Sequence, residues 1–181
     1  MIVNLVDKRE GGITTMFHEG DLIIYSVHGV CRIDEVCVKS LAGVSKPYYE
    51  LHPLGNETLK ISTPVDNASV LMQKLIGPEE AKTLIDSFRA PGIPWIDNNN
   101  ERHHRFTAII KTGNREEITK VVSTLMRKKQ WAELNHKKLG NQDNQLLLGI
   151  QNILFNEMAI ALKMTYEDVM NEVQGKVAAN L

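Results

Sequence analysis

The sequence lacks most features of common catalytic and metal-binding sites. It contains two cysteines, Cys31 and Cys37, which are too few for a zinc site or a disulfide framework. It has no HExxH motif, no glycine loop of the phosphate-binding type and no CxxC pair. His103 and His104 are adjacent, and neighbouring side chains on a helix point about 100° apart, so they cannot both face one metal ion. We therefore expect a protein that is not an enzyme and has no metal or cofactor.

Long apolar runs are also missing. No continuous run reaches the ~18 residues that a membrane-spanning helix needs, and the N-terminus has no apolar segment of the secretory type. These observations predict a cytoplasmic protein that does not enter a membrane. Residues 1–15 differ from the rest and end at a possible second start, Met16, which Glu10-Gly11-Gly12 precedes. We interpret 1–15 as an N-terminal extension, either disordered or the product of a mis-set start.

Charge is unevenly distributed along the chain, although the net charge is only −1. Residues 16–94 carry seven Lys and Arg against ten Asp and Glu. Residues 95–140 carry ten Lys and Arg against five Asp and Glu. A basic middle third between acidic flanks is typical of a surface that attracts a polyanion, although a solvated helix face has the same composition.

Residues 16–66 have the pattern of a small β domain. Four runs rich in β-branched and aromatic residues predict strands at 22–25, 30–38, 47–54 and 58–63. Gly29 and Gly55 mark the turns, and His28 is expected to pack on Tyr25. Short strands at this spacing predict a small, curved antiparallel barrel, and an open edge of such a barrel can accept a partner strand.

Residues 67–181 have helical spacing instead, so the predicted fold class is α+β. Prolines, glycines and capping residues predict helices that start near Pro78 and end before Pro91, and that cover about 99–111, 115–134 and 141–163. A capping box at 165–168 predicts a short final helix. We expect these helices to form an all-α bundle.

The stretch from Pro91 to Arg105 separates the two patterns and is the strongest candidate for a site. Trp95 follows two prolines that stiffen the loop, and a basic segment begins a few residues later. A single tryptophan is often a packing residue, but a rigid loop that presents an indole beside cations is also what stacking against a base step requires. Trp131, within the third predicted helix, is interpreted as a packing residue.

The order of several motifs resembles a known family. Met16-Phe17-x-x-Gly20-Asp21-x-Ile23-x-Tyr25-x-x-His28-Gly29 is similar to the opening of CarD-like (CdnL) bacterial transcription regulators. The same module occurs as the RNA polymerase-interacting domain of transcription-repair coupling factor. The similarity continues through Tyr48-Tyr49-x-Leu51, residues 59–65 and Trp95, as far as Thr112-Gly113 and beyond to about Leu162.

This resemblance implies a Tudor-like (SH3-like) barrel that docks on the β subunit of RNA polymerase. Lys39 and Ser62, with Lys60 beside it, match the polymerase-facing positions. Ser62 lacks the family's charge, so backbone pairing along Leu59–Thr63 is expected to carry more of the docking. The resemblance also implies that Trp95 contacts the minor groove of promoter DNA and that Arg102 and Arg105 contact its backbone.

The function expected is a transcription regulator that stabilises the promoter open complex by placing Trp95 at the upstream edge of the bubble. One alternative is a protein–protein adaptor without DNA contact, in which Trp95 packs between the domains. A more distant alternative is an enzyme with a metal or a polar pocket near His103.

Overall fold

The computed structural model describes residues 16–41 and 43–179, so the predicted extension 1–15 lies outside the described residues. The chain forms two compact units that divide between Lys74 and Leu75. The first unit is built from strands and the second from helices. This arrangement confirms the α+β class, with a β unit followed by an all-α unit.

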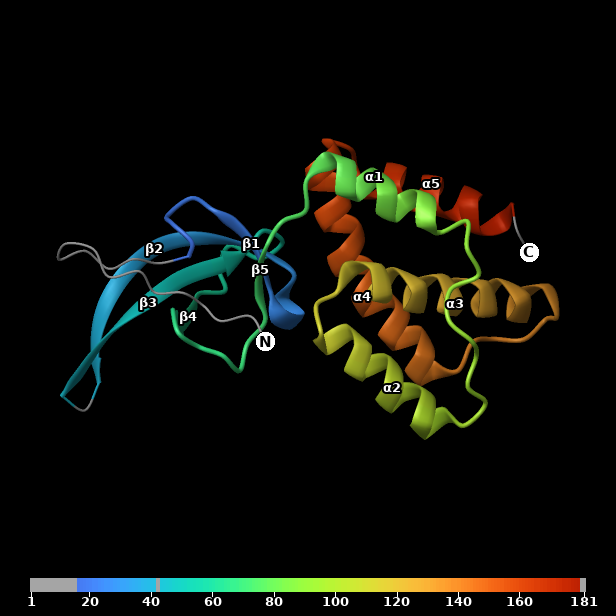
Figure 1. The fold of residues 1–181 in the computed structure, drawn as a ribbon, viewed down its shortest axis with the longest axis horizontal. Coiled ribbons are helices and arrows are strands. Elements are labelled where there is room, and N and C mark those ends of the chain that lie inside the picture. The colour runs from blue at the N-terminus through green and yellow to red at the C-terminus, as the bar shows by residue number, and fades with distance from the viewer. Residues whose placement is uncertain (1–15, 42, 180–181) are drawn as a thin grey trace. The chain divides into compact units, whose positions relative to one another are not determined.

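The β unit is one antiparallel sheet in the order β4-β3-β2-β1-β5 (Figure 1). Its elements are β1 (Leu22–Tyr25), a 3-10 turn η1 (Ser26–His28), β2 (Val30–Leu41), β3 (Val44–Pro53), β4 (Ile61–Pro64) and β5 (Met72–Lys74). The long β2–β3 hairpin is strongly curved, which gives the unit its barrel-like form. The expected contact between Tyr25 and His28 is confirmed, with ring centroids 5.9 Å apart.

A bulge sets which side chains of β2 enter the core. The β2–β3 register shifts between Ile33 and Glu35, so the inward face runs through Cys31 and Ile33 and resumes at Val36. Strict alternation along the strand would place Val36 on the same face as Val30 and Arg32. The bulge is the reason that strict alternation does not hold along this strand.

Strand β5 was not expected from the sequence. The predicted β domain ended at residue 66, whereas Met72–Lys74 pairs with β1 and the β unit extends to Lys74. Three residues are too few for a period of two to be recognised. The backbone of β5 nevertheless completes the sheet, because Tyr25 pairs with Met72 and Ser26 donates a bond to the Leu71 carbonyl.

The helical unit has five helices: α1 (Pro78–Ser87), α2 (Asn99–Lys111), α3 (Arg115–Leu134), α4 (Asn141–Leu162) and α5 (Tyr166–Ala178). Each corresponds to a predicted helix. The predicted capping box is present, with Thr165 and Asp168 bonded to each other's backbone N–H groups. Acidic first turns and side-chain caps at Asn98 and Asn114 fix the starts of α2 and α3.

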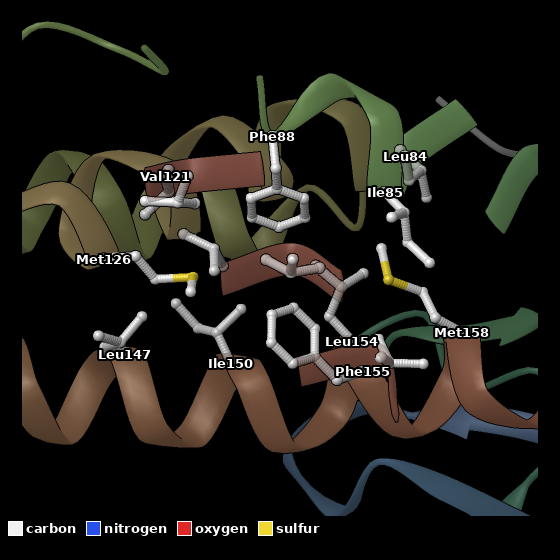
Figure 2. Packing of buried hydrophobic residues seen from close by; sticks show 14 of the residues in the cluster. Leu84, Ile85, Phe88, Val121, Met126, Leu147, Ile150, Leu154, Phe155 and Met158 are labelled. Carbon is white, nitrogen blue, oxygen red and sulfur yellow. The ribbon is translucent and has the colours of Figure 1, made fainter. Parts of the chain in front are cut away.

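Aromatic and aliphatic side chains from α1, α3, α4 and α5 form the core of the helical unit (Figure 2). Phe88 and Phe155 meet edge to face, with ring centroids 5.9 Å apart. Phe88, like Phe106 on α2, is fully buried. Ile93, Trp95 and Ile96, in the loop between α1 and α2, pack against this core.

Helix α4 is long and apolar enough, by length and composition, to cross a membrane. In the helical unit it packs against α1, α3 and α5 and contributes Leu147, Ile150 and Leu154 to the core. Its apolar composition therefore corresponds to burial in a helical core. Helix α4 also carries two buried carboxylates, Asp143 and Glu157.

Candidate functional site

The loop before Trp95 lies directly against α3. Gly92 has a φ of +85°, and a Cβ there would be 2.5 Å from both the Lys120 carbonyl and the Thr124 hydroxyl. The Thr124 hydroxyl accepts a bond from the Ile93 N–H at 2.8 Å and lies 2.7 Å from the Ile93 carbonyl. Only glycine allows so close an approach in this conformation. Gly92 and Thr124 therefore fix the backbone two residues before Trp95.

Two further α3 side chains hold the beginning of the same loop. Ser123 donates to the Ala90 carbonyl at 2.9 Å. Arg127 donates to the Phe88 carbonyl at 2.8 Å and to the Val177 carbonyl on α5 at 3.1 Å. The Arg127 guanidinium thus satisfies carbonyls left unpaired at the end of α1.

Trp95 is half-buried and packs against the helical core. The Arg102 guanidinium carbon lies 4.0 Å from the centroid of the indole, and the Lys128 ammonium lies 4.9 Å from it. Both distances are within the range of cation–π attraction. The indole is thus in contact with two cations, one from α2 and one from α3.

The side chain of Arg102 is buried and bonded within the helical unit. It is 3% exposed and forms a two-pronged ion pair with Asp143, with Nε–Oδ1 and Nη2–Oδ2 distances of 3.0 and 2.6 Å. Its Nη2 also donates to the Asn99 side chain, and its Nη1 donates to the Ile96 and Asp97 carbonyls. The guanidinium expected to contact a DNA phosphate is therefore engaged within the chain, where it holds the Trp95 loop. Arg105, one turn further on, is exposed.

Trp131 differs from its interpretation as a packing residue, because its side chain is 48% exposed. The Lys128 ammonium lies 4.7 Å from its ring centroid, and the Lys137 ammonium lies 5.9 Å from it. Trp95 and Trp131 both line a hollow of about 220 Å³, together with Lys128, Lys137 and Lys138. The basic helix end and the Trp95 loop thus form one surface.

In the β unit, the residues expected to face a protein partner lie around Glu50. Lys39 donates to the Glu50 carboxylate at 2.6 Å and to the Ser62 hydroxyl at 2.9 Å. The bond from Lys39 lowers the pKa of Glu50, with smaller contributions from Ser62 and Lys60, and the same bond raises the pKa of Lys39. Lys39, Lys60 and Ser62 are therefore brought together, but Glu50 offsets much of the charge of Lys39.

Strand β4 forms one edge of this sheet and, among the described residues, pairs with β3 alone. The bond from the Val65 N–H to the Pro47 carbonyl marks a hydrogen-bonded pair next to Tyr48 and Pro64. Such pairs alternate along an antiparallel ladder, so the backbone of Ser62 points away from β3. The edge can therefore offer the Ser62 N–H and carbonyl to another strand.

The structure also bears on the two alternative functions, an enzyme with a site near His103 and an adaptor in which Trp95 only packs. Within residues 16–41 and 43–179, no group of three His, Cys, Asp or Glu side chains could hold a metal ion. His103 and His104 line a separate hollow of about 250 Å³ with Thr107 and Gln142. All the aromatic and cationic contacts of Trp95 described above are made within the helical unit.

The sequence reasoning missed the residues that hold the site in place. Gly92, Ser123, Thr124 and Asp143 are essential to the loop geometry, and none was singled out. The available signals were a glycine between two prolines and a Ser-Thr pair within an otherwise apolar helix face. The partner of Arg102 could not be read from the sequence, because Asp143 is 41 positions away.

Two family matches cover most of the chain. Residues 17–76 match the CarD-like/TRCF RID domain, and residues 83–174 match the CarD C-terminal domain. The first match ends shortly after β5, and the second begins within α1. CarD-like proteins are in general non-enzymatic transcription factors. The chain therefore belongs to the CarD family, and it is a transcription regulator with an RNA polymerase-interacting N-terminal domain.

Proposed function

We propose that this protein stabilises the promoter open complex by holding Trp95 at the upstream edge of the transcription bubble. The observation that carries the proposal is the fixed setting of the indole. Gly92 and Thr124 hold its loop, and Arg102 and Lys128 contact its ring. A side chain ordered before binding loses little entropy when it inserts beside a base step.

The polymerase contact in this proposal is the exposed edge of β4, which adds a strand to the β subunit. Backbone bonds from Ser62 supply the pairing, and Lys60 supplies a peripheral charge. The charge of Lys39 contributes less, because Glu50 is bonded to it. Docking in this way raises the local concentration of the DNA-binding surface, so a weak and non-specific DNA contact is sufficient.

The DNA contact divides between two kinds of residue. Trp95 faces the minor groove at the edge of the bubble, and the exposed Arg105 and the half-buried Lys128 neutralise phosphates. Arg102 positions Trp95 through its bonds to Asp143, Ile96 and Asp97. This assignment separates the two arginines, one as a phosphate contact and one as a positioning residue.

The test combines polymerase binding with promoter opening. We expect Trp95→Ala to co-purify with core polymerase as the unchanged protein does, and to lose the increase in permanganate-reactive promoter thymines. Loss of both properties would indicate a folding defect, which thermal unfolding would detect. Full promoter opening by a folded Trp95→Ala variant would instead favour the adaptor function, in which Trp95 only packs.

A further inference from the structure

The hollow between Trp95 and Trp131 has features that a duplex wedge does not require. Trp131 lies near the end of α3, is 48% exposed and faces the Lys128 ammonium, which also faces Trp95. A single cation therefore lies over both indole rings. A wedge acts as one protruding ring, whereas this arrangement is concave and has two rings.

The segment after Trp131 is folded back onto it by a helix-terminating motif. His136 takes a left-handed φ of 54°, and the His136 and Lys137 N–H groups donate to the Glu133 and Ala132 carbonyls at 3.0 and 2.8 Å. This is the bonding pattern of a Schellman motif. The motif reverses the chain and brings the Lys137 ammonium to 5.9 Å from the Trp131 ring centroid. The backbone of this motif thus fixes the position of Lys137 near the Trp131 ring.

The size and chemistry of the hollow limit what can bind there. Its volume of about 220 Å³ is below the ~300–1,000 Å³ of pockets for drug-sized ligands. Its polar side chains include three lysines, and its one carboxylate, Asp143, is already paired with Arg102. A flat group linked to an anion fits these properties, and an unpaired nucleobase with its phosphates is such a group.

We propose that Trp131 is a second stacking residue, which binds an unpaired base of single-stranded DNA while Lys137 and Lys138 contact the adjacent phosphates. A paired duplex does not satisfy this site, because stacked bases present only their edges in the grooves. The inference rests on the proposed function for its setting, since promoter opening exposes a single strand beside Trp95.

The fluorescence of the two tryptophans allows a direct test on the full-length protein. The chain has two tryptophans, so Trp95→Phe leaves Trp131 as the only indole. We expect a short oligothymidylate to quench this variant in a salt-dependent manner and a hairpin duplex to quench it much less. Absence of quenching at low salt, or equal quenching by duplex, would overturn the inference. Quenching by core polymerase alone would also overturn it, because the surface would then be a protein contact.

Affinity measurements on variants extend the test. Trp131→Ala should weaken oligothymidylate binding about fivefold or more, whereas Trp131→Phe should retain most of it. Leu134→Ala, an exposed apolar change one turn away, is the matched control and should leave binding unchanged. Equal affinity of Trp131→Ala and the unchanged protein would contradict the proposal.

The experiments distinguish failure of the Trp131 inference from failure of the proposed function of Trp95. If Trp131 does not bind single strands but Trp95→Ala still fails to stabilise the open complex, only the present inference fails. If Trp131 binds single strands but Trp95→Ala stabilises the open complex fully, the proposed function of Trp95 fails instead.

Discussion

Arg102 illustrates how the role of a single residue depends on its partners. By type and position it could contact a phosphate, but it is buried and paired with Asp143 in a two-pronged geometry. A buried guanidinium is tolerated only where its donors are satisfied. Here the acceptors are Asp143, Asn99 and the carbonyls just after Trp95. Its contribution to function therefore passes through the position of the indole.

The first prediction concerns this pair. Arg102→Ala should lower the free energy of unfolding by about 3–5 kcal/mol, because it leaves the Asp143 carboxylate buried without a partner. The double change Arg102→Met with Asp143→Leu should recover much of that loss, since it removes both charges. Denaturant unfolding measures both variants. A loss below about 1 kcal/mol in Arg102→Ala would show that the pair is not buried in solution.

Cys31 gives a prediction about pH. Burial raises the pKa of its thiol from 9.0 to about 11, so the folded state holds the proton more tightly than the unfolded state. The stabilisation is complete below pH 9 and is lost as pH rises toward 11, by about 2 kcal/mol at the end of that range. As pH rises across this range, the free energy of unfolding should fall more steeply for the unchanged protein than for Cys31→Ala. Parallel curves would contradict the assignment.

At the scale of elements, the Trp95 loop depends on α3 more than on its own prolines. Ser123, Thr124 and Arg127 bond successive carbonyls and amides of the loop. The prolines limit the freedom of the chain, but side chains on a rigid helix set its place. This division explains why the loop is ordered without regular structure of its own.

Gly92→Ala tests this dependence. The added Cβ would meet the Lys120 carbonyl and the Thr124 hydroxyl at 2.5 Å, in a backbone conformation that alanine rarely adopts. We expect a loss of about 1–3 kcal/mol in unfolding free energy and, in a Trp131→Phe background that leaves Trp95 as the only indole, a changed fluorescence spectrum. Gly149→Ala is the matched control, because nothing lies within 4 Å of its added Cβ. It should be neutral or stabilising by up to about 1 kcal/mol. An unchanged spectrum in Gly92→Ala would show that the loop does not depend on this contact.

The elements themselves were largely predictable from the sequence, and the contacts between them were not. The start of α2 at Asn99 follows from the Asn98 cap, and the start of α1 follows from a proline in its first turn, both of which act locally. Strand β5 was missed because it is short and depends on pairing with β1. Trp131 was misjudged because hydrophobic periodicity cannot show that a helix end extends beyond the core.

At the scale of the whole molecule, the proposed function requires both units of one chain. The β unit supplies an exposed edge strand, and the helical unit supplies an ordered indole among cations. Neither contact needs high affinity if the chain links them, because linkage replaces a second encounter with a local one. This dependence makes the effect of a docking variant sensitive to protein concentration.

Ser62→Pro should reveal that sensitivity. It removes the N–H that β4 offers to a partner strand, so polymerase affinity should fall about fivefold or more. Ser62→Ala removes only the hydroxyl and should bind nearly as well as the unchanged protein. At saturating concentration, Ser62→Pro should recover full stabilisation of the open complex. Failure to recover at saturation in a folded variant would contradict docking by edge-strand addition.

The central claim is that Trp95 stabilises the open complex, and the lifetime of that complex tests it most directly. Competitor-challenged decay should be measured with the unchanged protein, with Trp95→Ala and without protein, at concentrations that saturate polymerase. A contribution of about 1–2 kcal/mol corresponds to a lifetime longer by about 5- to 30-fold. We predict that Trp95→Ala returns the lifetime to the value without protein. A lifetime equal to that with the unchanged protein would contradict the account.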